Sequence, residues 1–122
     1  MTEIFLIRHG QSEWNAKNKF TGWVDSDLSE KGKLEAKHAG ELIKNTKVKI
    51  SFSYTSYLKR AQETLNIILN VIGNKEKFIE KAWELNERHY GSLTGLNKEE
   101  TRAKLGEETL RKYRRSWDVA PP

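Results

Sequence analysis

The chain has 122 residues, which is enough for one domain with a core of moderate size, and 36% of them are hydrophobic against 32% charged. It contains no cysteine, which excludes a disulfide framework and thiolate metal sites and fits a reducing compartment. No apolar run approaches the roughly 20 residues that cross a bilayer, and Glu3, Arg8 and His9 interrupt any secretory pattern. We expect one cytoplasmic domain over residues 1–122 that does not bind a membrane.

The charge balance is basic, with 22 Lys and Arg against 17 Asp and Glu and a net charge of +5. Such a surplus suits nucleic acid, anionic lipid or small anionic substrates. Apart from Arg111-Lys112 and Arg114-Arg115, the basic residues are scattered, and no nucleic-acid-binding motif is visible. We interpret most of them as a solvated surface and expect no nucleic-acid partner.

Residues 4–7 form an uninterrupted apolar run, Ile-Phe-Leu-Ile, that ends at Arg8-His9-Gly10. A short, wholly apolar run predicts a strand buried on both faces, as in a parallel sheet. The residues after it would then lie where open α/β sheets bind their ligands. A cation, an imidazole and a glycine at this place could bind a phosphate and attack it.

Residues 11–28 lack a clean hydrophobic period and predict an ordered loop with a short helical start. A loop of this length inside a compact domain usually serves function. Ser29 is a plausible N-cap for a helix over residues 30–44, where apolar residues recur at spacings of three and four. His38 lies in this helix among Lys and Glu, and we interpret it as a surface histidine.

Residues 48–54 alternate apolar and polar side chains and predict a second strand. Ser56 is a candidate N-cap for the amphipathic helix that follows, which should end near Gly73. The first turn of that helix holds Lys59 and Arg60, although a helix N-terminus favours anions. Such a conflict is typical of an anion-binding site, and the alternative is that Arg60 reaches into solvent.

Residues 77–85 predict a third short strand, and a dense polar loop over residues 86–91 follows it. Asn97 with Glu100 resembles a capping pair for a short helix ending before Gly106, and a last helix should extend to Trp117. Strands that alternate with helices indicate an α/β domain with a mainly parallel sheet. Three strands are few for such a sheet, so the chain looks short.

Charged groups recur at the C-terminal ends of the three predicted strands, with Arg8 after the first, Arg60 after the second and Glu87 after the third. Guanidinium groups bind phosphate bidentately, and a neighbouring carboxylate can move a proton to or from a hydroxyl group. His9 could carry a covalent intermediate as a nucleophile, or it could be structural.

The stretch Leu6-Ile-Arg-His-Gly-Gln-Ser-Glu-Trp-Asn15 resembles the signature of the histidine phosphatase (phosphoglycerate mutase-like) superfamily. Further stretches are similar to the cofactor-dependent phosphoglycerate mutases, namely Phe20-Thr-Gly-Trp23, Asp27-Leu-Ser-Glu-Lys-Gly32, Tyr54-Thr-Ser56, Leu58-Lys-Arg-Ala61, Leu85-Asn-Glu-Arg-His-Tyr-Gly91 and Leu93-Thr-Gly-Leu-Asn-Lys98. The resemblance extends from residue 3 to the terminal Pro-Pro, and its Leu85–Gly91 stretch favours a mutase over a generic phosphatase. It implies a three-layer α/β/α fold with a mainly parallel sheet.

The resemblance implies a glycolytic enzyme that interconverts 3-phosphoglycerate and 2-phosphoglycerate through a phosphohistidine intermediate. His9 would accept the phosphoryl group, with 2,3-bisphosphoglycerate as the priming donor and no metal required. Glu87 would donate and accept protons, and Arg8 and Arg60 would hold the transferring phosphate. The implied substrate-binding residues are Ser12, Asn15, Thr21, Gly22, Tyr90, Lys98, Arg114 and Arg115.

The chain departs from this family in its length and in one motif. Members are much longer and carry a second histidine in an Ala-His-Gly-type stretch, which none of His9, His38 and His89 matches. The family's strand that ends in this histidine lies between the first two strands, so its absence would leave two unpaired edges. We therefore expect an incomplete domain without its C-terminal half: a fragment of a longer enzyme, a shortened gene product, or a chain that two copies complete as a homodimer.

A mutase is the leading interpretation of the sequence, and two alternatives remain. One is a phosphatase of the same superfamily, which hydrolyses the phosphoenzyme; the other is a catalytically impaired remnant that only binds phosphorylated metabolites or a protein partner. The segment from Tyr90 to Lys98 with Arg114 and Arg115 favours the mutase, because a generic phosphatase has less need of a phosphoglycerate-shaped cationic set. We expect much weaker mutase activity than in a full-length relative.

Overall fold

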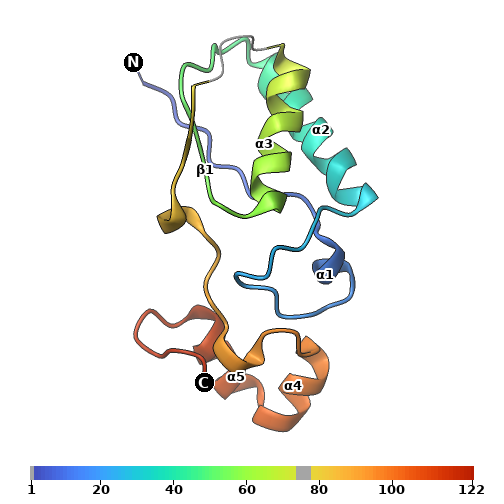
Figure 1. The fold of residues 1–122 in the computed structure, drawn as a ribbon, viewed down its shortest axis with the longest axis vertical. Helices are drawn as coiled ribbons and strands as arrows, with labels where there is room; N and C mark the ends of the chain where they lie inside the picture. Colours follow the sequence, from blue (N-terminus) through green and yellow to red (C-terminus); the bar gives the residue numbers. More distant parts are fainter. Residues whose placement is uncertain (1, 74–77) are drawn as a thin grey trace.

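The computed structural model describes residues 2–73 and 78–122. Its elements form two groups (Figure 1): the helices α2 (Glu30–Asn45) and α3 (Lys59–Ile72) with a small sheet, and the helices α4 (Lys98–Leu105) and α5 (Glu107–Arg115) at the other end. The short helix α1 (Glu13–Ala16) and its loop lie between the two groups. This mixture of helices and parallel strands confirms the α/β class. None of the helices in the described ranges is both long and apolar enough to span a bilayer.

The helices α2 and α3 pack side by side, and each buries apolar residues, namely Ala36, Ile43, Ile68 and Leu69. A glycine permits their close approach, since a Cβ atom at Gly40 would lie only 2.9 Å from the Cβ atom of Val71. Ser29 caps the first turn of α2, where its side chain accepts a hydrogen bond from the N–H of Gly32. The predicted helix and its N-cap are confirmed.

The helix α3 begins later than its predicted N-cap, Ser56. Its N-cap is Leu58, which offers no side-chain hydrogen bond, while the Ser56 hydroxyl accepts a hydrogen bond from the N–H of Leu58. The carboxylate of Asp25, from the loop after α1, instead accepts a hydrogen bond of 2.7 Å from the N–H of Lys59. Ser56 as N-cap was therefore wrong, because a tertiary contact caps this helix. The predicted end at Gly73 is confirmed, and this glycine has a left-handed φ of 78°.

The strands β1 (Ser53–Thr55) and β2 (Ile79–Lys81) form a two-stranded parallel sheet. The 3-10 helix η1 (Trp83–Leu85) follows β2. Both strands are shorter than the predicted ranges 48–54 and 77–85, of which residue 77 lies outside the described residues. Alternation of side chains does not by itself create a strand, and the ladder covers only residues that face a partner.

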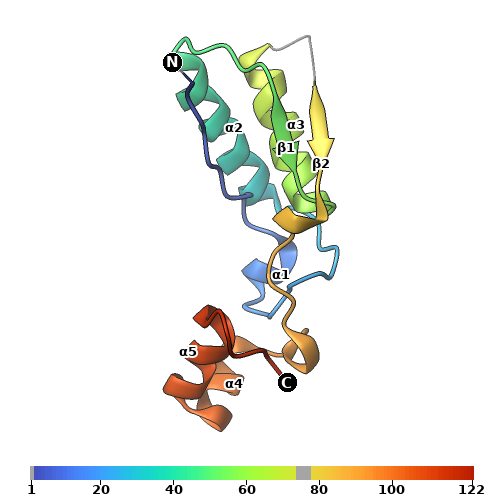
Figure 2. The ribbon, with the colours of Figure 1, turned by 90° about the vertical axis from the view of Figure 1, so that its left-hand side faces the viewer.

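The predicted first strand over residues 4–7 is wrong. This segment has no strand structure, and its side chains are exposed, with Ile4 at 79% and Leu6 at 93% of full exposure. Its backbone makes no hydrogen bond to another described residue. Figure 2 shows the segment apart from β1. A strand requires a neighbour for its ladder, so an apolar run without one stays extended and unpaired.

A second core joins the α4–α5 end of the molecule to the loop over residues 11–28, hereafter the aromatic loop. It consists of Phe20, Leu93 and Leu110, with Tyr90 and Tyr113 packed against it. The 3-10 helix η2 (Gly91–Leu93) contributes Leu93 to this core. The loop over residues 11–28 is therefore ordered, as predicted, and its short helical start is α1.

The helix α4 has the N-cap that the sequence predicted, since the side chain of Asn97 accepts hydrogen bonds from the N–H groups of Glu99 and Glu100 at 2.9 and 3.1 Å. Gly106 ends α4 and separates it from α5. Trp117 lies beyond the end of α5 and is 93% exposed, so the prediction that the last helix carries it was wrong.

Candidate active site

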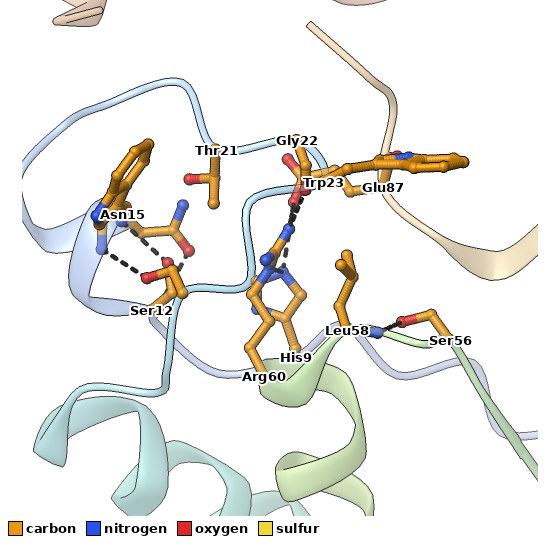
Figure 3. Close-up of polar contacts among 12 residues, drawn as sticks. His9, Ser12, Asn15, Thr21, Gly22, Trp23, Ser56, Leu58, Arg60 and Glu87 are labelled. Atoms are coloured by element: carbon orange, nitrogen blue, oxygen red, sulfur yellow. Dashed lines mark hydrogen bonds and ion pairs between the residues drawn. The ribbon is translucent and has the colours of Figure 1, made fainter. Parts of the chain in front are cut away.

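His9 follows the extended N-terminal segment and faces the start of α3 (Figure 3). Its Nδ1 lies 2.7 Å from the carbonyl oxygen of Gly10, which can only accept a hydrogen bond. Nδ1 therefore carries the proton of the neutral ring, and the lone pair stays on Nε2. This Nε2 lies 3.3 Å from Nε of Arg60 and 3.7 Å from Oε2 of Glu87. The nitrogen that could attack a phosphorus atom thus faces a guanidinium group and a carboxylate.

Gly10 fixes the backbone that carries His9. Its N–H donates to the Thr64 hydroxyl at 3.2 Å, and that hydroxyl donates to the carbonyl of Arg60. A Cβ atom at Gly10 would lie 2.2 Å from the carbonyl oxygen of Gly32, so only glycine fits this contact between the N-terminal segment and α2. Thr64 carries no signal in the sequence that marks it as part of the site.

Arg60 lies at the centre of the site and is completely buried. Its guanidinium donates hydrogen bonds to the carbonyl oxygens of Gly22 at 2.5 Å and Val24 at 2.8 Å, and to Oε2 of Glu87 at 2.8 Å. With the contact to His9, all but one of its N–H groups are used. Arg60 therefore does not reach into solvent, and it joins the aromatic loop to the loop that holds Glu87.

Glu87 is held as a carboxylate. Partial burial would raise its pKa, but the neighbouring His9 ring and the hydrogen bond and positive charge of Arg60 lower that pKa to about 2. The backbone of Glu87 is fixed as well, since Trp23 Nε1 donates to its carbonyl oxygen at 2.6 Å. In this arrangement Glu87 is ionised and a weak base, so it can take up and donate a proton only after its contact with Arg60 changes.

Cationic side chains gather beside His9 without anionic partners. Arg8, Asn15 and Lys98 line the same cavity as His9, which has a volume of about 540 Å³. Burial and the charge of Arg114 lower the pKa of Lys98, while Glu87 opposes this effect. No ion pair joins Arg8, Lys98 or Arg114 to another residue of the described ranges. This cluster of unpaired cations is suited to a phosphate or carboxylate.

Arg114 has a buried Nε that makes no hydrogen bond within residues 2–73 and 78–122. A buried donor without a partner is costly and calls for an explanation. Arg115, its neighbour at the end of α5, is exposed, and neither of the two arginines lines the cavity of His9. The structure thus brings Arg114 into the electrostatic surroundings of Lys98 and leaves Arg115 apart.

Other residues named from the resemblance are occupied by internal contacts. Ser12 is fully buried and caps α1, accepting from the N–H of Asn15, whose own Oδ1 accepts from the N–H of Ser12. Thr21 is 2% exposed, and its hydroxyl donates to a backbone carbonyl. Tyr90 packs on Phe20 with ring centroids 5.1 Å apart. Ser12 and Thr21 do not line the cavity and support the backbone around it, whereas Asn15 lines the cavity.

Four further side chains support the site without having been given a role in it from the sequence: Trp23, Asp25, Thr64 and Arg88. Trp23 and Arg88 belong to stretches that resemble the family, whereas Asp25 and Thr64 lie outside them, and the contacts of all four are tertiary and have no sequence pattern. No group of three or more His, Asp or Glu side chains within the described ranges could hold a metal ion.

The sequence profile of the histidine phosphatase superfamily (branch 1) matches residues 4–122. The chain belongs to this superfamily. Among curated relatives of the chain, the 2,3-bisphosphoglycerate-dependent phosphoglycerate mutase of Pelagibacter ubique is 55% identical over 99% of the chain and 50% of the relative. The enzyme of the same name from Hamiltonella defensa is 53% identical over 98% of the chain and 48% of the relative. The chain spans about half the length of the curated relatives it matches.

Solved structures of the same fold cover the chain to a similar extent. A mycobacterial glucosyl-3-phosphoglycerate phosphatase in complex with VO3 has a TM-score of 0.78 and 26% identity, over 93% of this chain and 51% of that protein. A phosphoglycerate mutase from Bacillus anthracis has a TM-score of 0.75 and 26% identity, over 86% of this chain and 47% of that protein. The expected phosphoglycerate mutase-like fold is therefore confirmed over about one half of those chains.

Proposed function

We propose that this chain is a phosphoglycerate mutase that interconverts 3-phosphoglycerate and 2-phosphoglycerate through a phosphohistidine at His9. The observation that carries the proposal is the geometry of His9, whose Nδ1 is tied to a carbonyl oxygen while Nε2 faces Arg60 and Glu87. The names of the 55% and 53% identical relatives favour a mutase over other phosphohistidine enzymes.

In the proposed reaction, Nε2 of His9 forms a bond to phosphorus as the bond from phosphorus to the substrate oxygen breaks. Arg60 and Arg8 balance the negative charge on the phosphoryl oxygens, because guanidinium donors bind them bidentately. Glu87 gives a proton to the leaving oxygen and takes one from the attacking hydroxyl in the return step. Since Oε2 of Glu87 is bonded to Arg60 at 2.8 Å, an arriving phosphate would compete with Glu87 for this guanidinium.

The residues beside His9 fit 2,3-bisphosphoglycerate, which carries anionic groups at both ends. Arg8 and Lys98 would bind one group near His9, and the unpartnered Nε of Arg114 is a donor for another. When bound, this compound would supply the phosphoryl group that loads His9. Asn15, whose amide nitrogen donates to no described residue, would add a further hydrogen bond to it.

We propose a limited role for the other residues that the resemblance implies. Gly22 acts through its carbonyl oxygen, which holds Arg60, and Ser12 and Thr21 act by supporting the backbone around the cavity. Tyr90 and Arg115 would contact the distal end of the substrate only after a change of position. The substrates are small phosphorylated acids, the compartment is the cytoplasm, and neither nucleic acid nor membrane is a partner.

The incomplete sheet supports a proposal on activity. The relatives are about twice as long, and the apolar segment over residues 4–7 has no partner strand among the described residues. We expect the 122-residue chain to turn over much more slowly than a full-length relative. A homodimer in which two copies complete each other's open edges would relieve this defect, and light scattering at several concentrations would detect it.

A phosphatase is the second candidate, because a solved neighbour with a TM-score of 0.78 is a phosphatase. The two functions differ in their products. Incubation with 3-phosphoglycerate, with and without 2,3-bisphosphoglycerate, should yield 2-phosphoglycerate if the proposal is correct. Release of inorganic phosphate without 2-phosphoglycerate would favour the phosphatase, and binding of substrate without any product would favour a catalytically impaired chain.

A further inference from the structure

Arg88 follows Glu87 directly in the chain, but its side chain points to a different part of the molecule. Its guanidinium donates hydrogen bonds to the carbonyl oxygens of Tyr113 at 2.8 Å and Val119 at 3.5 Å, and to that of Ser116. Ser116 is the C-cap of α5. The last carbonyl groups of a helix lack partners inside the helix, and the helix dipole places negative charge there. Arg88 therefore caps the C-terminal end of α5.

This cap joins two parts of the site that are far apart in the sequence. On one side, Glu87 contacts Arg60, and the carbonyl oxygen of Arg88 lies 3.0 Å from the position of a Cβ atom at Gly22. On the other side, α5 carries Arg114, whose charge acts on Lys98 in the cavity wall. Arg88 thus connects the loop that holds the carboxylate to the helix that holds the unpartnered guanidinium.

An arginine is needed for this connection because its planar guanidinium reaches several carbonyl groups at once. A lysine would keep the positive charge at the helix end but would present a single ammonium group on a flexible stem. Arg111, also on α5, provides a contrast, since it is exposed and its only bonding partner among residues 2–73 and 78–122 is Glu108 on the same helix. Its removal should not alter the position of the helix.

We propose that Arg88 is a positioning residue that holds α5 so that Arg114 can bind the distal anionic group of the substrate. This inference rests on the proposed function for the identity of the ligand. Arg88 itself touches no reacting atom. Its loss should weaken binding of a ligand with two anionic ends and spare a ligand with one.

The test is equilibrium binding by calorimetry of 3-phosphoglycerate and of inorganic phosphate to the full 122-residue chain and its variants. We expect Arg88→Met to weaken binding of 3-phosphoglycerate on the order of 10-fold, which corresponds to about 1.4 kcal/mol, and to change binding of inorganic phosphate less than about twofold. The affinity of Arg88→Lys for 3-phosphoglycerate should lie between those of the wild type and Arg88→Met. Arg111→Met is the matched control and should bind both ligands like the wild type.

Coupling between the two arginines gives a second measurement. Arg114→Met should weaken 3-phosphoglycerate binding to a similar degree, and adding Arg88→Met to it should cause little further loss, because residues that act as one unit are not additive. Equal loss of binding for both ligands in folded Arg88→Lys would overturn the inference, as would full additivity of the two variants or an absence of 3-phosphoglycerate binding to the wild type. Retained, Arg88-dependent binding without product formation would leave the inference standing and contradict the mutase function instead.

Discussion

Nη2 of Arg60 lies 2.8 Å from Oε2 of Glu87, and the same guanidinium donates through Nε to Nε2 of His9. One buried cation therefore contacts both the proposed nucleophile and the proposed acid-base group. The carboxylate occupies a hydrogen-bonding position that a phosphoryl oxygen would need. Binding of phosphate and the pairing of Glu87 with Arg60 are thus expected to compete, and release of the carboxylate would raise its pKa from about 2 and allow it to carry a proton.

The first prediction concerns stability in acid. The folded pKa of Glu87, about 2, lies below its ordinary value of 4.5, so its ion pair stabilises the folded chain above about pH 5. This contribution should decrease as the pH falls from 4.5 towards 2. Urea unfolding between pH 3 and 7 should show a steeper loss of stability for the wild type than for Glu87→Gln. Parallel curves for the two proteins would show that the ion pair does not form.

The second prediction concerns the buried guanidinium. Arg60→Met would leave the carbonyl groups of Gly22 and Val24 and the carboxylate of Glu87 without their donor, at a cost of about 3–5 kcal/mol in the free energy of unfolding. Arg60→Lys keeps the charge but cannot reach all these acceptors, so its loss in the free energy of unfolding should be smaller than that of Arg60→Met but still measurable. Urea denaturation measures both. A loss below about 1 kcal/mol for Arg60→Met would mean that these contacts are weak.

The third prediction concerns the backbone beneath His9. Gly10→Ala places a Cβ atom 2.2 Å from the carbonyl oxygen of Gly32, so the segment must move, at a cost of about 1–3 kcal/mol and with displacement of His9. Gly73→Ala is the matched control. It has no atom within 4 Å of the new Cβ and pays only about 1 kcal/mol for its left-handed φ. Phosphate binding should decrease in Gly10→Ala alone; an equal decrease in both would assign the effect to general loss of stability.

The fourth prediction concerns the apolar segment over residues 4–7. Leu6 is 93% exposed, so Leu6→Ala should change the free energy of unfolding by no more than about 0.5 kcal/mol. Leu69, at 1% exposure in the packed face of α3, should cost about 2–5 kcal/mol when changed to alanine. Thermal or urea unfolding of the two variants gives the comparison. A large cost for Leu6→Ala would indicate that the segment is buried in solution, for example between two copies.

The helices were predictable because their signals are local. Ser29, Gly73 and Asn97 mark helix ends through hydrogen bonds or φ angles within a few residues. The absence of a strand over residues 4–7 could not be predicted in this way, because pairing and burial of an apolar run depend on a neighbouring strand that no local pattern specifies. The prediction of Ser56 as the N-cap of α3 was wrong for the same reason, since the carboxylate that accepts from the N–H of Lys59 belongs to Asp25, in a distant part of the chain.

The candidate site shows the same division. The resemblance named His9, Arg60 and Glu87, and the structure brings these three together. The resemblance gave no information on the partners of these three residues. Arg60 bonds to the backbone carbonyl groups of Gly22 and Val24, and every residue has such a group, so no sequence pattern marks them. Arg88 was visible only as a charged residue of a polar loop, and its partner, the end of α5, was defined only once the helices had packed.

The central claim, that His9 is the phosphorylated nucleophile, is tested most directly by intact mass after incubation with 2,3-bisphosphoglycerate. The wild-type chain should gain the mass of one phosphoryl group, and His9→Ala should gain none. His38→Ala, which changes an exposed histidine on the α2 wall of the same cavity, is the control for specificity and should still gain one phosphoryl group. An unlabelled wild type, or labelling that persists in His9→Ala, would contradict the account.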